Sequence, residues 1–150
     1  MILFQVSRFR FHVRAKSMAT INKFEDLEIW QLARDICRQV KIHIEKEKFS
    51  KDFTLKDQIK RSSGSSMDNI AEGFERDGNR EFIQFLSIGK GSIGETRSQT
   101  YRAYDYGYIS KEECELMVQE CIKLSQKMGS LITYLKNSEL KGLKFRKDDK

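Results

Sequence analysis

Proline does not occur once in the 150 residues of this sequence. Because proline is the strongest interrupter of a helix, its absence leaves glycine and capping side chains to set every helix boundary. The sequence also lacks any apolar run near the roughly 18 residues that a membrane-spanning helix requires. Both absences favour a helical protein that does not cross a membrane.

Residues that commonly build metal sites and active sites are scarce, with three cysteines and two histidines. An odd cysteine count without close pairs argues against a disulfide framework and predicts reduced thiols in the cytoplasm. Cys114 and Cys121 lie on an apolar stripe, so we expect them to be buried and inert. His12 and His43 form neither a Glu-x-x-His pair nor a zinc-binding spacing. We therefore expect no metal, no cofactor, no small-molecule substrate and no enzymatic activity.

The formal charge of +6 is concentrated at the two ends of the chain. Residues 1–18 carry four Arg/Lys and no acid, and residues 136–150 carry six Arg/Lys against three acids. The body between them, residues 19–135, holds 18 basic and 19 acidic residues. A basic total is therefore weak evidence that the folded body binds phosphate.

The composition of the ends predicts a single domain with two appended segments. We expect residues 1–18 to be a disordered or non-native N-terminal extension, with Met18 as an alternative start. Within it, residues 9–14 alternate like a strand but have no evident pairing partner. An arginine-rich organelle transit peptide is the other interpretation of this segment. Residues 19–137 are predicted to form the domain, and residues 138–150 a basic C-terminal tail.

Apolar residues spaced three and four apart predict four amphipathic helices, at about 22–48, 54–74, 80–106 and 110–135. The last of them has the most regular stripe, made of Cys114, Met117, Cys121, Leu124, Met128, Leu131 and Leu135. Such a stripe is typical of a heptad seam. Four helices with short connections predict an all-α, up-and-down antiparallel four-helix bundle.

Capping patterns mark the predicted helix ends. Three pairs have the spacing of a capping box, namely Asn22 with Glu25, Thr54 with Asp57, and Ser110 with Glu113. Gly107 is placed to end the third helix.

Small residues are concentrated in two of the predicted helices. Residues 62–66 read Ser-Ser-Gly-Ser-Ser, and residues 89–94 match the G-x-G-x-x-G pattern. A dinucleotide site would need those glycines between a strand and a helix, and no further strand follows them. We therefore interpret residues 89–94 as a small-residue groove of the third helix that faces the serine-rich segment of the second and lets the two helices approach closely.

Candidate phosphate-binding residues form three clusters within the nearly neutral body. They are Arg34, Arg38 and Lys41 on the first helix, Lys56, Lys60 and Arg61 on the second, and Lys90 and Arg97 on the third. Phosphate contacts need Lys and Arg gathered on one surface, whatever the net charge. Taken alone, each cluster is more typical of an ordinary solvated helix face. The clusters point to phosphate binding only if assembly brings them together.

Several short motifs, in a fixed order, resemble one known family. They are FEDLEIWQ at 24–31, NIAEGF at 69–74, REFIQFL at 80–86, GSIGET at 91–96 and GYIS at 107–110. Over about residues 22–136 the chain is similar to the bacterial four-helix bundle proteins also called 23S rRNA intervening-sequence proteins. Relatives often have proline just before the NIAEG motif, whereas this chain has Asp68.

The resemblance implies a ring-like homopentamer without catalytic activity, and some relatives are encoded within ribosomal RNA genes. It also implies kinship with a retroelement accessory protein that partners a reverse transcriptase. The motif residues Asn69, Ile70, Ala71, Glu72 and Gly73 are then expected to be structural or to form a subunit contact. Our leading hypothesis is an oligomer that binds ribosomal RNA or a ribonucleoprotein. The alternative is a scaffold that docks a nucleic-acid enzyme.

Overall fold

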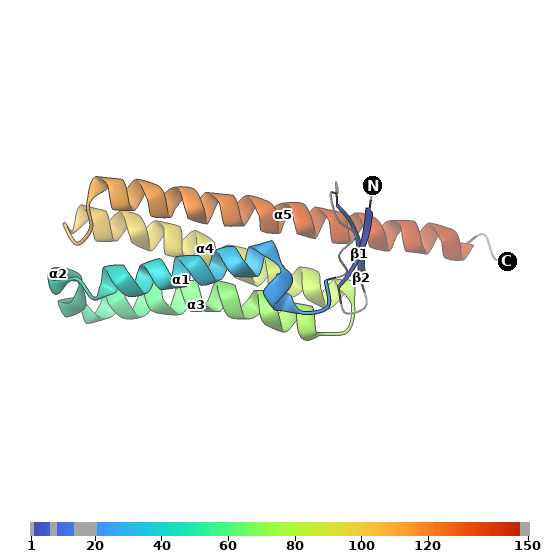
Figure 1. Cartoon of the computed structure of the whole chain (residues 1–150), viewed down its shortest axis with the longest axis horizontal. Helices are drawn as coiled ribbons and strands as arrows, with labels where there is room; N and C mark the ends of the chain where they lie inside the picture. The colour runs from blue at the N-terminus through green and yellow to red at the C-terminus, as the bar shows by residue number, and fades with distance from the viewer. Residues whose placement is uncertain (1, 7–8, 14–20, 148–150) are drawn as a thin grey trace.

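The computed structural model describes the backbone of residues 2–6, 9–13 and 21–147, and the side chains of residues 21–138. Four long helices run along the length of the molecule, as Figure 1 shows: α1 (Glu28–Ile44), α3 (Phe53–Glu75), α4 (Asn79–Asp105) and α5 (Lys111–Lys147). α1 packs on α3 and α5, and α4 packs on the same two helices. Successive helices reverse direction, so the predicted all-α, up-and-down four-helix bundle is confirmed.

The core of the bundle is apolar and continuous. The largest fully buried side chains come from every long helix and from the short α2 (Glu47–Lys51). They include Ile36, Phe49, Ile70, Phe82, Leu86 and Leu124. Among the residues that the structure describes, no helix is long and apolar enough to cross a membrane.

The start of the first helix differs from the prediction. Asn22 does not cap it; a single 3-10 turn, η1 (Phe24–Asp26), comes first, and α1 begins after Leu27. The Leu27 side chain is buried instead of forming a capping hydrogen bond. Hydrophobic anchoring therefore fixes this end, where the sequence pattern suggested a polar cap.

The end of α1 and the start of α3 also differ from the prediction. The helix expected to reach Lys48 stops at Ile44, and residues 47–51 form the separate helix α2. Phe49 of α2 is fully buried, which holds this short helix against the bundle end. The N-cap of α3 is Asp52, whose side chain accepts a hydrogen bond from the Leu55 N–H at 3.0 Å. Thr54 already lies inside the helix, so its predicted capping role is wrong.

The connection from α4 to α5 follows the sequence prediction. Gly107 has a φ of +76°, a left-handed conformation that glycine adopts without strain, and its N–H donates to the Tyr104 carbonyl at 2.9 Å. The Ser110 N–H donates to Glu113 at 2.9 Å, and the Glu113 N–H donates to Ser110 Oγ at 3.1 Å. This reciprocal pair is the predicted capping box.

The predicted heptad seam of α5 lies against the other helices. Six of its seven residues are buried, and Leu131 is half-buried. The helix does not end near Leu135 but continues to Lys147, beyond the ends of the other helices (Figure 1). Most of the predicted basic tail is thus a helical continuation, and residues 148–150 lie outside the described residues.

The N-terminal segment contains a β-hairpin. β1 (Ile2–Val6) pairs antiparallel with β2 (Phe9–Val13), with Ile2 opposite Val13 and Val6 opposite Phe9. The strand-like alternation of residues 9–14 therefore has a partner within the preceding residues, which the sequence analysis failed to recognise. Met18, the predicted alternative start, lies outside the described residues.

Helices α3 and α4 approach each other closely through their small residues. A Cβ added to Gly89 would lie 3.3 Å from the Ser66 carbonyl oxygen and 2.9 Å from the terminal methyl of Met128. The G-x-G-x-x-G segment lies entirely within α4. It therefore does not lie between a strand and a helix, as a dinucleotide site requires. The close packing is confined to Gly89, because a Cβ at Gly91 or Gly94 would meet nothing within 4 Å.

Candidate nucleic-acid interface

The three predicted basic clusters lie on three different helices of the bundle. Seven of the eight side chains are exposed, and Lys56 is half-buried. Because α1 and α4 occupy diagonal positions in the bundle, their clusters do not meet within one chain. Grouping of all three by assembly stays a prediction.

The α1 cluster is largely offset by neighbouring carboxylates. The Arg38 guanidinium lies 3.1 Å from Asp35, and the Lys41 ammonium lies 2.6 Å from Glu45. These are exposed pairs one helical turn apart, so they contribute little to stability. They do reduce the positive charge that this face presents to phosphate.

The α3 cluster is also mixed in charge. Arg61 lies 2.9 Å from Asp57, and a groove of about 580 Å³ along this helix is lined by Asp57 and Asp68 as well as Lys60 and Arg61. Lys60 forms no ion pair with any described residue. The groove therefore presents two cations and two carboxylates.

Two of the predicted cations lie over aromatic rings. The guanidinium of Arg34 is 5.5 Å from the centre of the Trp30 ring, and the ammonium of Lys56 is 5.2 Å from that of Phe53. Such contacts are worth about 0.5–1 kcal/mol at exposed sites, and they hold the charge in a preferred position.

The α4 pair has a different environment. Lys90 and Arg97 line a groove of about 140 Å³ between α4 and α5, together with Ile93, Gly94, Cys121 and Ser125. No carboxylate lines this groove, and neither cation forms an ion pair within the described part of the chain. Of the three clusters, this pair presents the least compensated positive charge.

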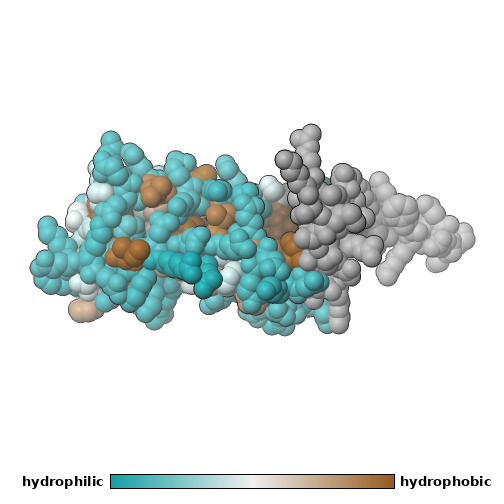
Figure 2. Space-filling model, viewed as in Figure 1, coloured by the Kyte–Doolittle hydropathy of each residue, from teal (hydrophilic) through white to brown (hydrophobic). Residues whose placement is uncertain are grey.

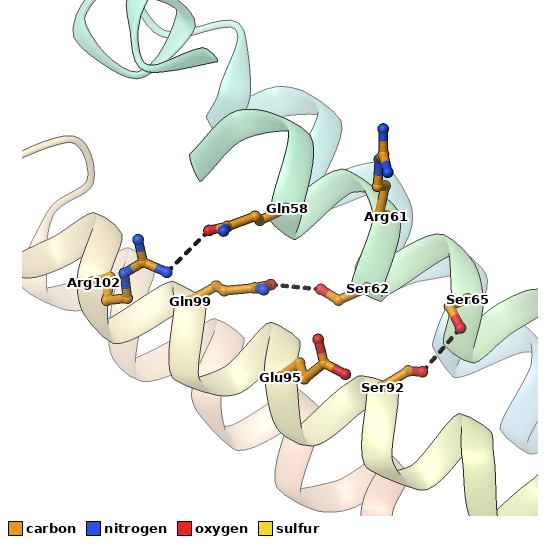
Figure 3. Close-up of a pocket in the computed structure, with 8 residues that line it drawn as sticks. All are labelled: Gln58, Arg61, Ser62, Ser65, Ser92, Glu95, Gln99 and Arg102. Carbon is orange, nitrogen blue, oxygen red and sulfur yellow. Dashed lines mark hydrogen bonds between the residues drawn. The ribbon is translucent and has the colours of Figure 1, made fainter. Parts of the chain in front are cut away.

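A third groove, polar and not predicted from the sequence, lies between α3 and α4. Its volume is about 330 Å³, and Figure 3 shows its lining residues: Gln58, Arg61, Ser62, Ser65, Ser92, Glu95, Gln99 and Arg102. The serine-rich segment of α3 was predicted to face residues 89–94 of α4, and Ser92 of that segment does line the groove. The contributions of Glu95, Gln99 and Arg102, further along α4, were not predicted.

Hydrogen bonds cross this groove between the two helices. Ser62 Oγ donates to Gln99 Oε1 at 2.6 Å and lies 2.8 Å from Thr96 Oγ1. Nearer the open surface, the Ser65 and Ser92 hydroxyls are 2.9 Å apart (Figure 3). The polar groups are thus committed to each other and fix the register of α3 against α4.

The predicted motif at residues 69–73 lies in the second half of α3. Asn69 Nδ2 donates to the Ser65 carbonyl at 2.8 Å, Ile70 is fully buried, and Ala71 is half-buried. A Cβ on Gly73 would lie 2.7 Å from Phe85 Cβ. Within one chain the Asn69 hydrogen bond lies inside α3, whereas the close approach at Gly73 positions α3 against α4.

Glu72, also in this motif, is exposed and lies 2.9 Å from the Arg76 guanidinium. That pairing raises the pKa of Arg76. The ion pair joins residues one turn apart, and the Arg76 guanidinium also lies 5.3 Å from the centre of the Phe85 ring of α4.

His43 is the one histidine whose side chain is described. Its ring is half-buried, and burial lowers its pKa, so the ring is neutral at pH 7. Nδ1 lies 3.4 Å from a Glu113 carboxylate oxygen. In the part of the chain that the structure describes, no group of His, Cys, Asp and Glu is arranged to hold a metal ion.

The face of the molecule in Figure 2 is mainly hydrophilic, and its apolar side chains form small, separate patches. The most exposed large apolar residues are Phe53, Ile42 and Leu116, each on a different helix. Scattered apolar residues of this kind are ordinary on a protein surface.

Comparison with known proteins places the chain in a family. A solved structure with the same fold is that of a protein of unknown function from the S23 ribosomal protein family of Bacteroides thetaiotaomicron VPI-5482. It has a TM-score of 0.64 and 23% sequence identity, and the match covers 69% of this chain and 97% of that chain. No curated protein matches this chain.

The sequence profile of the 23S rRNA-intervening sequence proteins matches residues 25–130. The match includes all five motifs that carried the resemblance in the sequence, apart from Phe24 at the edge of the first. Because it spans well over half of the chain, the protein belongs to the family of 23S rRNA-intervening sequence proteins.

Proposed function

We propose that the chain is a non-enzymatic, cytoplasmic homo-oligomer that binds structured RNA, ribosomal RNA or a ribonucleoprotein in particular. The observation that carries this proposal is the groove between α4 and α5, where Lys90 and Arg97 face solvent without a lining carboxylate. Lys and Arg gathered in this way are what phosphate contacts require. The family name supports RNA as the partner.

Assembly would increase the effect of a modest site. A homopentamer would repeat the Lys90–Arg97 groove five times, and linked binding events raise the overall affinity without any new contact at each site. The basic residues of α1 and α3 would then supply secondary contacts around the ring. The pentamer is the assembly that the resemblance in the sequence implies.

A scaffold that docks a nucleic-acid enzyme, such as a reverse transcriptase, is the second candidate. The ion pairs of Arg38 with Asp35, Lys41 with Glu45 and Arg61 with Asp57 favour it, because they leave two clusters with little free charge. Exposed, paired charges of this kind are better suited to specifying a protein partner than to binding phosphate.

A titration of the full chain against ribosomal RNA and an unrelated structured RNA tests the proposal. We expect tighter binding to ribosomal RNA, and an affinity that falls steeply between about 50 mM and 200 mM salt. Binding to neither RNA at low salt would exclude the RNA-binding function and favour the scaffold. Mass measurement of the free protein in the same buffer tests the pentamer.

Charge reversal separates the two candidates. Lys90→Glu with Arg97→Glu should abolish RNA binding while the oligomer mass is unchanged. Arg34→Glu with Arg38→Glu, on the more compensated α1 face, should have a smaller effect. If only the α1 variant loses a protein partner and RNA affinity is unaffected by both, the scaffold is the better account.

A further inference from the structure

The cations of the α4 groove continue into a row of exposed tyrosines. Lys90, Gly94, Arg97, Tyr101 and Tyr104 follow one another at spacings of four and three residues along α4. Residues at these spacings share one face of a helix. All five are exposed, so they form a continuous surface, which we call the α4 stripe.

Both tyrosines of the stripe are exposed to solvent. Tyr101 is 50% exposed and Tyr104 is 40% exposed. Within the described part of the chain neither ring contacts another aromatic ring, whereas Tyr106 packs edge-on against Tyr108 at 5.8 Å. Both tyrosines therefore expose surface that a base could contact.

Gly94 lies between the two cations on this face, and its lack of a side chain leaves open space between them. A Cβ at this position would have no neighbour within 4 Å. The space beside it is the groove that Ser125 of α5 also lines. A phosphate lying there would have Lys90 and Arg97 on either side and a hydroxyl donor below.

We propose that the α4 stripe binds unpaired nucleotides of RNA, with the phosphates at Lys90 and Arg97 and the bases stacked on Tyr101 and Tyr104. This inference rests on the RNA-binding function proposed above and specifies which part of an RNA is recognised. Cationic grooves combined with aromatic side chains are the usual means of binding single strands, because every base has a face that stacks. Unpaired loops are also where folded RNA splays out its bases.

The length of the stripe sets the size of the segment it binds. Fourteen residues separate Lys90 from Tyr104, a rise of about 21 Å along the helix. That length suits a segment on the order of four nucleotides, at the lower end of the range for single-strand sites. A duplex would present its bases edge-on within the helix and could not stack on the tyrosines.

Fluorescence anisotropy of the full chain with a labelled ten-nucleotide oligouridylate tests this proposal, with a blunt RNA duplex of ten base pairs as the comparison. We expect the single strand to bind at least tenfold more tightly than the duplex. Tyr101→Ala with Tyr104→Ala should weaken single-strand binding by about tenfold or more, because stacking of each base is lost. Tyr101→Phe with Tyr104→Phe should restore it to within about threefold. Tyr106→Ala, an exposed tyrosine off the stripe, should have no effect.

Three results would overturn the inference. The first is that single strand and duplex bind equally and that the alanine variant binds both as the wild type does. The RNA-binding function would then stand, but the α4 stripe would not be the binding site. Equal losses for strand and duplex in the alanine variant would assign the tyrosines a role other than base stacking. A lower oligomer mass in that variant would identify the stripe as a subunit contact. Failure of every RNA to bind would instead contradict the proposed function itself.

Discussion

Lys46 and Glu113 form an ion pair that joins the end of α1 to the start of α5, although 67 residues separate them in the sequence. The same carboxylate accepts a hydrogen bond from the Ser110 N–H in the capping box. The Lys46 ammonium and the Ser110 groups together lower the pKa of Glu113 to about 2. One side chain thus caps a helix and links two helices.

Glu113→Gln should destabilise the protein in a pH-dependent way. A carboxyl whose pKa is lower in the folded state stabilises that state above its unfolded value, near 4.5, and loses the effect as the pH falls toward 2. Because the side chain is about one-third exposed, we expect a loss of only about 1 kcal/mol at pH 7. Glutamine retains the capping geometry, so the change isolates the charge.

Urea unfolding of the wild type and this variant at pH 7, 4 and 2 checks the prediction. The difference in unfolding free energy should shrink as the pH falls and vanish near pH 2. Protonation of His43 also destabilises both proteins at low pH, because burial lowers its folded pKa. The effect is larger in the variant, which lacks the Glu113 charge 3.4 Å away that raises the pKa of His43, so the difference shrinks only as Glu113 itself is protonated. A difference that stayed constant from pH 7 to pH 2 would mean that the Glu113 charge does not stabilise the fold.

Gly73→Ala and Gly64→Ala should act in opposite directions, although both glycines lie within α3. The new Cβ at Gly73 would lie 2.7 Å from Phe85 Cβ and force α3 and α4 apart, at a cost of about 1–3 kcal/mol. At Gly64 the Cβ meets nothing within 4 Å, so alanine should stabilise the helix by about 0.5–1 kcal/mol. Thermal unfolding by circular dichroism compares the two. Similar shifts would contradict the close approach at Gly73.

The buried serines of α3 offer a second contrast. Ser62→Ala would leave the Gln99 carbonyl without its donor at 2.6 Å, which should cost about 1–3 kcal/mol. Ser66 Oγ is fully buried and has no partner among the described residues. Ser66→Ala should therefore be neutral or stabilise the protein by about 1 kcal/mol. Denaturant midpoints measure both, and a destabilised Ser66→Ala would reveal a partner for that hydroxyl.

The cysteines should react slowly in the folded protein. Burial raises the pKa of Cys121 to about 12, so only about one molecule in ten thousand carries that thiolate at pH 8. Cys37 is half-buried and should be the first to react, although burial raises its pKa too. Alkylation followed by peptide mapping, with and without denaturant, checks this order. Labelling of Cys121 at the rate of a free thiol would contradict its burial.

The sequence predicted the bundle because its strongest patterns are local. The α5 seam, the Ser110–Glu113 box and the Gly107 turn each depend on residues within a few positions of one another, and all three are present. Two of the wrong predictions concern the ends of α1, and tertiary packing explains both. Leu27 and Phe49 are buried, and their burial decides where α1 begins and where α2 breaks away.

The candidate site was predictable only in part. Periodicity placed Lys90 and Arg97 on one face of a helix, but it gave no way to know that Ser125 of α5 would lie beside them. Nor did it distinguish this pair from Arg38 and Lys41, since the distinction depends on which carboxylates lie within reach. What distinguishes the candidate clusters is their contacts with neighbouring side chains, and local sequence spacing does not determine those contacts.

The most direct test of the central claim is the salt dependence of RNA binding by the wild type and by Lys90→Gln with Arg97→Gln. Each phosphate contact to a single strand contributes about 0.7 to the slope of log affinity against log salt concentration. The double variant should therefore lower that slope by about 1.4, whereas Arg38→Gln with Lys41→Gln should change it much less. An unchanged slope in the Lys90 and Arg97 variant, with RNA still bound, would contradict the assignment of this groove as the phosphate site.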